Sequence, residues 1–557
     1  MRRVGPRLAR PAAAALAGLL AVLAAPGALG GGLFAVSFGM LLPLLWALDG
    51  ARVRAAFAYG HLCGMVAVGL GFSWIETLLT RYAGVPGALA PLVLLLFAGV
   101  FALQFSLPAA FAAFVRRRTG RPMLLAFAAP YALCEVALPT IFPMNLAIAW
   151  AEHPAWIQLA DLGGVTLVTF ALVALQCAVY DLLAALRRGA RRAAAAWVAI
   201  AAGIAAAVPS YGQVRLADLD QALAEARRVR FGLVQGNMAI EDVLAPGGAE
   251  TILRKHQAAS ADLERRGAEL LVWGETAYPF GPWLGRARGG DLPPSHPYRV
   301  RRGFAGPLVV GYVDEAEGDP YPWNTARVLR PDGTFGDRYD KVYRLLFGEY
   351  VPLVDPAWFQ SIFPTASHLH RGEGPTVLRA GGLRLGPLIC YEDVLEDYAR
   401  QVAALDIDLF VNLTNDAWFG GGAEPRQHLA LAVFRTVEHR RAMVRAVTTG
   451  VSAHIDPGGR ILARTRVTDP ATEGPQPPDT LLADAAVFDR PAPATVYARA
   501  PHGKTVLYLA LVTLAVVPAR RRRCVGRADL AAPGGHGPET GDGAAGGDDH
   551  GAAERPS

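Results

Sequence analysis

Cysteine is scarce in this chain, and so are the patterns that bind metals or nucleotides. Five cysteines occur among 557 residues, and Cys390 is the only one between Tyr211 and Lys504. A disulfide bond within that stretch is therefore excluded. The sequence has no cysteine or histidine spacing typical of a metal site and no glycine-rich phosphate loop, so we expect neither a metal nor another cofactor.

Charge is sparse in the first 210 residues, which consist mostly of long apolar runs. The whole chain is 52% hydrophobic with a mean hydropathy of +0.27, whereas residues 211–503 have the composition of a soluble α/β protein. A helix that crosses the hydrocarbon of a bilayer needs about 20 residues. We therefore predict about eight membrane spans, the last of them the shortest: 11–29, 31–48, 56–79, 88–115, 122–140, 164–186, 193–209 and 505–518.

Arginine clusters alternate with nearly uncharged loops between these spans. By the positive-inside rule every cluster lies in the cytoplasm, which places residues 210–503 outside and both termini inside. The clusters also account for the net charge of +6, so we expect no nucleic-acid partner. They are Arg2 to Arg10, Arg52 and Arg54, Arg116 to Arg121, Arg187 to Arg192, and Arg520 to Arg523.

The pattern divides the chain into four regions. We expect membrane helices in 1–210 (about seven spans), an extracytoplasmic domain in 211–503, a final span with its arginine cluster in 504–523, and a disordered tail in 524–557. Strands that alternate with helices in the second region are typical of a layered α/β domain. Alternatively, the first span is a cleaved signal peptide, since it has a basic start and small residues near its end.

Cys390 lies at a predicted strand-to-helix turn, between a strand over Leu383–Ile389 and a helix over Val394–Leu405. One interpretation is a buried apolar cysteine. The other is a reactive thiol, because an unpaired cysteine in an oxidising compartment is a candidate for chemistry.

Two charged residues also follow predicted strands, namely Glu275 and Lys341. Strand ends of a shared sheet bring distant residues together. A carboxylate can take the proton of a thiol, and an ammonium favours the thiolate and stabilises an oxyanion. The backbone N–H of Tyr391 is a second candidate oxyanion donor. The alternative for either charged residue alone is a solvated surface charge.

Six motifs in chain order carry a family resemblance: Val234–Asn237, Trp273–Thr276, Tyr339–Lys341, Phe347–Pro352, Ile389–Glu392 and Asn415–Phe419. They resemble the Glu–Lys–Cys triad of the nitrilase superfamily, and residues 11–518 as a whole resemble its membrane-bound branch, the apolipoprotein N-acyltransferases. Two positions depart from that pattern, because Gly274 and Leu346 stand where the family usually has proline. Both departures concern the backbone beside the site.

The resemblance implies a polytopic helical membrane domain and a nitrilase-like αββα domain, with Glu275, Lys341 and Cys390 as the catalytic triad. It further implies that Glu349 supports Lys341 and that Tyr391 and Glu392 shape the site around the thiol. Candidate substrate-binding residues are Asn415, Trp418 and Phe419, of which the two aromatic residues are alternatively core, and the pair Trp358 and Phe359. We expect that pair to lie on an arm that dips into the membrane and admits lipid.

The activity implied is transfer of an acyl chain from a phospholipid, through a Cys390 thioester, to the α-amine of a diacylglyceryl-modified apolipoprotein. The expected enzyme is a monomer in a bacterial inner membrane, with its catalytic domain on the periplasmic side. One alternative is a membrane-tethered nitrilase-type amidase that uses water as the second nucleophile. Another is a transporter or receptor whose outer domain binds a ligand without chemistry.

Overall fold

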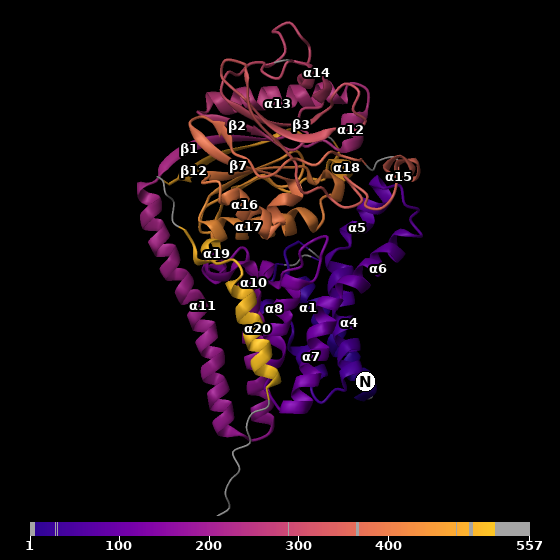
Figure 1. Ribbon diagram of the computed structural model, residues 1–557, viewed down its shortest axis with the longest axis vertical. Helices are drawn as coiled ribbons and strands as arrows, with labels where there is room; N and C mark the ends of the chain where they lie inside the picture. The colour runs from indigo at the N-terminus through magenta and orange to yellow at the C-terminus, as the bar shows by residue number, and fades with distance from the viewer. Residues whose placement is uncertain are drawn as a thin grey trace, which may run out of the picture. The chain divides into compact units, whose positions relative to one another are not determined.

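The computed structural model describes residues 6–517 except 28, 30, 31, 288, 364–366, 475 and 489–493 (Figure 1). The predicted disordered tail, the cluster Arg520 to Arg523 and the first two arginines of the N-terminal cluster lie outside the described residues.

Apolar helices make up the N-terminal part of the chain. Among the described residues, four helical segments are long and apolar enough to cross a membrane: Val53–Gly71 (α4), Ala90–Thr119 (α6, Ala90–Phe101, and α7, Leu103–Thr119), Ala160–Arg187 (α10) and Arg191–Glu225 (α11). Shorter apolar helices occupy Leu8–Ala24 within α1 (Pro6–Ala24), Phe34–Leu48, Leu124–Ala137 and Gly503–Val516 (α20). Each of the eight segments overlaps one predicted span. Helix α11 runs without a break through residue 210, where we expected the membrane region to end.

Several segments that we expected to be single spans are interrupted or irregular. Residues 31–48 contain two helices, α2 (Phe34–Ser37) and α3 (Leu42–Leu48), and α3 has a proline in its first turn, where proline starts a helix easily. The side chain of Gln176 accepts the backbone N–H of Leu41 at 2.7 Å, so the interruption leaves that buried donor satisfied. Residues 122–140 contain a π-helical turn before α8 (Ala129–Ala137).

Two six-stranded sheets form the α/β part within the described residues. The first has the order β12-β1-β2-β3-β4-β5 and the second the order β11-β10-β9-β8-β7-β6. The first contains β1 (Arg227–Gln235), β2 (Leu270–Trp273), β3 (Leu308–Asp314), β4 (Trp323–Leu329), β5 (Phe335–Asp340) and β12 (Asp479–Val487). The second contains β6 (Leu378–Ala380), β7 (Leu383–Ile389), β8 (Leu409–Thr414), β9 (Met443–Val447), β10 (Ala453–Ile455) and β11 (Ile461–Arg464).

The two sheets pack face to face because their strands are apolar on the inner side. In β1, Val229, Phe231 and Leu233 join the shared core, whereas Val234 faces helix α13 (Gly248–Arg265), as the alternation of a strand requires. Helix α13 covers the outer face of the first sheet, and α16 (Glu396–Ala403) and α17 (Glu424–His439) cover the second (Figure 1). The four layers are thus helix, sheet, sheet and helix.

Residues 443–455 form two antiparallel strands, β9 and β10, and not one continuous strand. The chain reverses at Gly450, which has a φ of +141° that side chains rarely adopt. The hydroxyl of Ser452 accepts the N–H of Val447 at 3.1 Å and closes the turn.

Polar contacts join the α/β part to the apolar helices. The guanidinium of Arg440 lies 2.6 Å from the carboxylate of Asp161 in α10, and both side chains are buried. The indole N–H of Trp74 in helix α5 (Trp74–Thr77) donates to Gln427 in α17 at 3.1 Å. Helix α17 therefore lies between the second sheet and the membrane-type helices, and residues from both sides can line one site.

Candidate active site

The three predicted triad residues each follow a strand, as the sequence indicated. Glu275 comes after β2, Lys341 directly after β5 and Cys390 directly after β7. The prediction that they share one sheet was wrong, since β2 and β5 belong to the first sheet and β7 to the second. The residues meet because the two sheets face each other and their strand ends lie on the same side of the sandwich.

Lys341 is the charged centre of the group. Its Nζ lies 3.2 Å from Glu275 Oε1 and 2.7 Å from Glu349 Oε1, and only 1% of Lys341 is exposed. Burial opposes the ammonium charge, but the two carboxylates outweigh burial and hold the pKa of Lys341 well above its usual value. The lysine therefore remains a cation at neutral pH and cannot act as a base.

The Cys390 thiol rests in its protonated form. Cys390 opens a 3₁₀ turn over Cys390–Val394 with a φ of +50°, a left-handed conformation that is uncommon for a residue with a side chain. Burial raises the pKa of the thiol well above its usual value; Glu275 raises it further and Lys341 lowers it. Burial also raises the pKa of Glu275, which makes its carboxylate a better proton acceptor.

Asn324 holds the carboxylate of Glu275, a contact that sequence reasoning missed. Its Nδ2 donates to Glu275 Oε1 at 2.7 Å, and its backbone oxygen accepts the N–H of Lys341 at 2.9 Å. Among the described residues, Asn324 and Lys341 both bond to Oε1, so Oε2 is the oxygen available to a thiol. The sequence around Asn324 carries no local signal for this contact.

Gly274 is explained by its surroundings, although the family resemblance predicts proline there. A Cβ at this position would lie 2.6 Å from the backbone N of Thr448 and 3.0 Å from the oxygen of Thr414. The hydroxyl of Thr448 also donates to the backbone oxygen of Glu275 at 2.7 Å. The second sheet thus approaches so closely that only glycine fits, and the same approach fixes the backbone of Glu275.

Glu392 connects the thiol-bearing turn to the segment after β5. One carboxylate oxygen accepts the N–H groups of Val342 (2.7 Å) and Tyr343 (3.0 Å). The other accepts the N–H of Ile389 (2.8 Å) and the hydroxyl of Tyr339 (2.6 Å). Glu392 is fully buried, so these four bonds satisfy a carboxylate that water cannot reach. The strand ends bearing Cys390 and Lys341 are therefore held together by one side chain.

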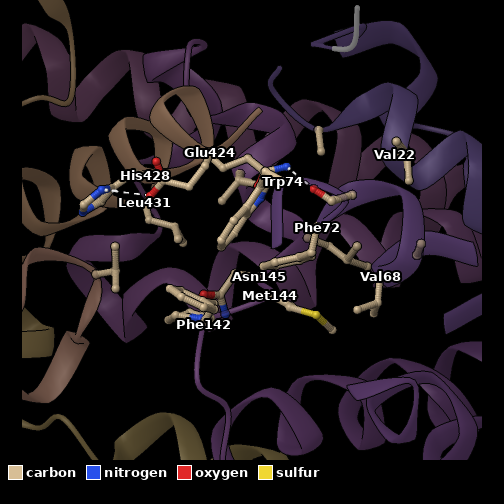
Figure 2. Close-up of a pocket in the computed structure, with 18 of the residues that line it drawn as sticks. Val22, Val68, Phe72, Trp74, Phe142, Met144, Asn145, Glu424, His428 and Leu431 are labelled. Atoms are coloured by element: carbon tan, nitrogen blue, oxygen red, sulfur yellow. Dashed lines mark hydrogen bonds and ion pairs between the residues drawn. The ribbon is translucent and has the colours of Figure 1, made fainter. Parts of the chain in front are cut away.

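Figure 2 shows an apolar pocket. Cys390 is one of the residues that line this pocket. Its volume is about 1000 Å³ including the open space at its mouth. Helices α1, α4 and α5 contribute Val22, Val68 and Trp74, and the α/β part contributes Cys390 and Phe419. The pocket therefore lies between the two parts of the molecule, with the thiol in its wall.

The other predicted site residues fall into two groups. Tyr391 and Phe419 line the pocket, and Phe419 is also buried core, 5.1 Å from Trp74 between ring centroids. The described lining does not include Asn415, which caps the turn Asp416–Phe419 by accepting the N–H of Ala417, or Trp418, which packs edge-on against Tyr82.

Trp358 and Phe359, which we expected on an arm that dips into the membrane, lie on a short helix, α15 (Pro356–Ile362). The side chain of Asp355 accepts the N–H of Trp358 at 2.9 Å and a proline occupies the first turn, which together start the helix. Trp358 is 57% exposed, and neither aromatic residue is part of the described pocket lining.

Family models match both parts of the chain. Residues 230–472 match the carbon-nitrogen hydrolase model, and residues 17–178 match the model of the apolipoprotein N-acyltransferase N-terminal domain. The fold and the residues gathered at Cys390 accordingly define a carbon-nitrogen hydrolase domain joined to apolar helices.

Curated relatives identify the branch. The apolipoprotein N-acyltransferase of Pseudomonas syringae pv. tomato is 34% identical over 73% of this chain and 79% of its own length. That of Geobacter metallireducens is 30% identical over 81% of this chain and 86% of its own. This chain belongs to the apolipoprotein N-acyltransferase family. Among solved structures, a variant of the Nesterenkonia AN1 amidase from the nitrilase superfamily aligns with 51% of this chain and 98% of its own, at 20% identity and a TM-score of 0.36.

Proposed function

We propose that this chain transfers an acyl chain from a phospholipid to the α-amine of a diacylglyceryl-modified cysteine at the N-terminus of an apolipoprotein. The observation that carries the proposal is the position of Cys390. Its thiol lies in the wall of an apolar pocket formed partly by membrane-type helices, and Glu275 and Lys341 act on it electrostatically. A soluble amide needs no such pocket, whereas an acyl chain does.

In the first half-reaction, Cys390 attacks the ester carbonyl of the phospholipid. Glu275 takes the thiol proton, and the sulfur forms a bond to the carbonyl carbon. Lys341 and the backbone N–H of Tyr391 stabilise the oxyanion that develops. When the tetrahedral intermediate collapses, the ester C–O bond breaks. The leaving alcohol takes the proton back from Glu275, so a lysophospholipid departs and a thioester remains on Cys390.

In the second half-reaction, the acceptor amine attacks the thioester. Glu275 accepts a proton from the amine, and the C–S bond breaks as the amide forms. The thiolate is reprotonated from Glu275, which regenerates the resting enzyme. Two successive transfers through one nucleophile imply ping-pong kinetics.

The membrane arrangement is part of the proposal. Four long apolar helices and four shorter ones support eight crossings, with the arginine clusters in the cytoplasm. The α/β domain then lies on the extracytoplasmic side, where both lipid substrates present their headgroups. Labelling of single introduced cysteines from each side of sealed vesicles tests this topology; labelling of the α/β domain only from the cytoplasmic side would contradict it.

Helix α15 is the element proposed to enter the membrane surface. Trp358 and Ile362 on the helix and Leu353 before it are strongly exposed apolar side chains, and Phe359 packs near Phe347. Exposed apolar clusters of this kind mark contacts with lipid or protein. We expect Trp358→Ser with Phe359→Ser to raise KM for a phospholipid in bilayers several-fold and to leave the rate with a short-chain soluble ester unchanged. Unchanged kinetics with bilayer lipid would refute this role.

Mass spectrometry of the Cys390 peptide tests the first half-reaction. The purified full chain is incubated with phospholipid in the absence of acceptor, and Cys390→Ala serves as the control. We expect a hydroxylamine-labile acyl adduct on Cys390 and an equal amount of lysophospholipid. An unmodified Cys390 without lysophospholipid would eliminate the lipid donor and favour an amidase or a binding protein.

A further inference from the structure

A network of buried charged side chains lies beside the Cys390 turn and has no part in the chemistry above. Its centre is His428 in α17. The Nε2 of His428 lies 2.8 Å from Asp393 Oδ1, and its Nδ1 lies 3.1 Å from Asp416 Oδ1. Asp393 belongs to the turn that Cys390 opens, and Asp416 belongs to the turn that ends in Phe419. One imidazole therefore bridges the thiol-bearing turn and a wall of the pocket.

Arg445 in β9 completes the network. Its guanidinium is fully buried and hydrogen-bonds to Asp393, to Asp416 Oδ2 (3.3 Å) and to Asn412 Oδ1 (3.1 Å). Burial and Arg445 oppose a charge on His428, but Asp393 and Asp416 outweigh them and hold the pKa of the imidazole well above its usual value. Asp393 and Asp416 are thus matched by two cations, as a buried network requires. Burial and the charge of Asp416 raise the pKa of the third carboxyl, Glu424, to about 7.

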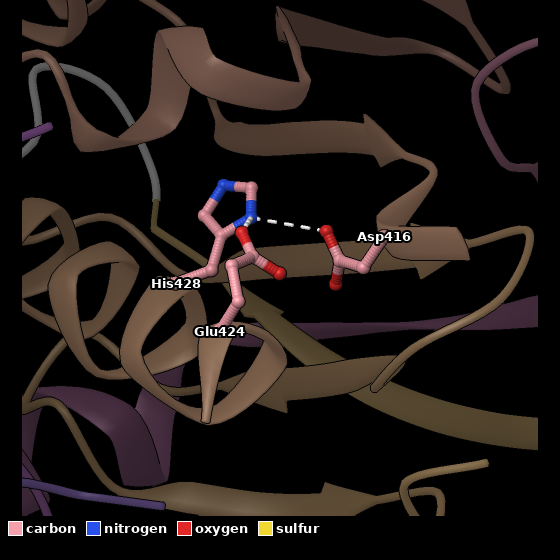
Figure 3. A group of neighbouring side chains, drawn as sticks. All are labelled: Asp416, Glu424 and His428. Atoms are coloured by element: carbon pink, nitrogen blue, oxygen red, sulfur yellow. Dashed lines mark hydrogen bonds and ion pairs between the residues drawn. The ribbon is translucent and has the colours of Figure 1, made fainter. Parts of the chain in front are cut away.

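The same cluster has residue types that bind metals. Atoms of Asp416, Glu424 and His428 that can act as ligands lie within 4.8 Å of one another (Figure 3). Hydrogen bonds to Asp393 and Asp416 occupy both ring nitrogens of His428. When both nitrogens are protonated, the imidazolium has no lone pair for a metal ion. We therefore treat the cluster as a salt-bridge network.

We propose that His428 is a positioning residue for acyl transfer, which holds the Cys390 turn in register with the pocket wall at Phe419. The inference rests on the proposed function. The left-handed φ of Cys390 is a strained conformation, and such strain persists only where the surroundings over-determine it. Glu392 fixes the turn toward the first sheet. The bridge from Asp393 through His428 fixes it toward α17.

The neighbouring residue Gln427 provides a matched control. Both residues line the pocket from α17, and the side chain of each makes two hydrogen bonds. Gln427, however, bonds to the oxygen of Gly71 (3.0 Å) and to the indole of Trp74 (3.1 Å), on the side of the apolar helices. We expect His428→Gln in the full chain to slow acyl-enzyme formation about 10–100-fold with KM for phospholipid unchanged. Gln427→Ala should instead raise KM with a smaller effect on kcat.

The pH dependence of Cys390 alkylation separates positioning from a general loss of structure. The charged groups that face His428 are Asp393, Asp416, Glu424 and Arg445. Asp416 raises the pKa of the Cys390 thiol. His428→Gln leaves Asp416 less neutralised and should move the alkylation profile to higher pH. Asp416→Asn removes that charge and should move the profile to lower pH while it also slows acyl transfer.

The proposal is supported if the alkylation profiles of His428→Gln and Asp416→Asn shift in opposite directions and both variants form the acyl-enzyme more slowly. An unchanged acylation rate in His428→Gln, or alkylation profiles that move in neither variant, would overturn it. Alkylation needs no lipid. If the wild-type chain forms no acyl-enzyme, the proposed function is refuted, while the alkylation profiles of the variants still test the electrostatic effect of the network on Cys390. Asparagine has nearly the same shape as aspartate, so Asp416→Asn is expected to fold. This variant keeps the proposal testable if His428→Gln does not fold.

Discussion

The pocket at Cys390 has two unlike ends. At the α/β end, hydrogen bonds and ion pairs hold the charged groups beside Cys390 in place, as Asn324 and Lys341 hold Glu275. At the other end, Val22 and Val68 line the pocket with apolar surface alone. Bond making requires groups fixed in position, whereas a flexible acyl chain requires only volume and protection from water. Substitutions at the first end should therefore change rates, and substitutions at the second should change substrate preference.

Among substitutions at the polar end of the pocket, loss of the Lys341 charge should reduce the rate of acyl transfer most. In Lys341→Met the oxyanion loses its cation, so we expect acyl-enzyme formation to slow by about 10³-fold. The ammonium also lowers the pKa of the Cys390 thiol, so its removal should move the alkylation profile to higher pH. Quenched-flow measurement of lysophospholipid checks the rate. The control is Lys255→Met in α13, the helix on the outer face of the first sheet, and this variant should change the rate less than twofold.

Removal of the Asn324 amide should have the next largest effect. In Asn324→Ala, Glu275 loses the bond that orients Oε1, and we expect kcat to fall about 10–100-fold with KM unchanged. Steady-state kinetics with saturating acceptor measures both constants. A higher KM with an unchanged kcat would mean that Asn324 binds substrate rather than orienting the base.

The close packing behind Glu275 can be tested by stability. Gly274→Ala places a Cβ 2.6 Å from the backbone N of Thr448, and the backbone there cannot yield without moving Glu275. We expect a loss of about 2 kcal/mol in the free energy of unfolding, measured as a lower Tm. Gly374→Ala is the control, because a Cβ at Gly374 meets no atom within 4 Å. Equal Tm values for the two variants would contradict the account of Gly274.

A larger side chain at the apolar end of the pocket should have the smallest effect on the rate of acyl transfer. It should, however, alter the preference for the length of the acyl chain. Val68→Phe fills space that we assign to the distal part of the acyl chain. We expect the ratio of kcat/KM for short over long acyl donors to rise about tenfold. Val53→Phe, at the exposed start of the same helix, should leave the ratio unchanged. The same ratio in both variants would show that the acyl chain does not bind at this end of the pocket.

The two ends also differ in how far the sequence predicts them. The alternation of apolar residues predicts the strand Leu383–Ile389 with the bounds that the structure has, and so places Cys390 at a strand end. The same reasoning places Glu275 and Lys341 after strands. It cannot tell which strands share a sheet, because periodicity carries no information on the order of strands. The meeting of two sheets at the triad therefore became visible only in the structure.

Less of the apolar end of the pocket can be predicted from the sequence. Hydropathy locates the spans but not the faces that pack, since nearly every residue of a span is apolar. The lining by Val22, Val68 and Trp74 depends on how helices far apart in the chain approach each other. The backbone donor at the interruption of the span 31–48 is satisfied by Gln176, 135 residues away from Leu41. Asn324 and His428 were likewise missed, since an isolated polar residue has no local signal for its partner.

The most direct test of the central claim is a chase of the isolated acyl-enzyme. The full chain is acylated on Cys390 with labelled phospholipid, freed of donor and lysophospholipid, and mixed with a peptide bearing an N-terminal diacylglyceryl cysteine. We predict that the label leaves Cys390 and appears as an amide on the peptide α-amine, much faster than it appears as free fatty acid. Release as fatty acid at the same rate with and without the peptide would contradict the account, because water would then be the acceptor.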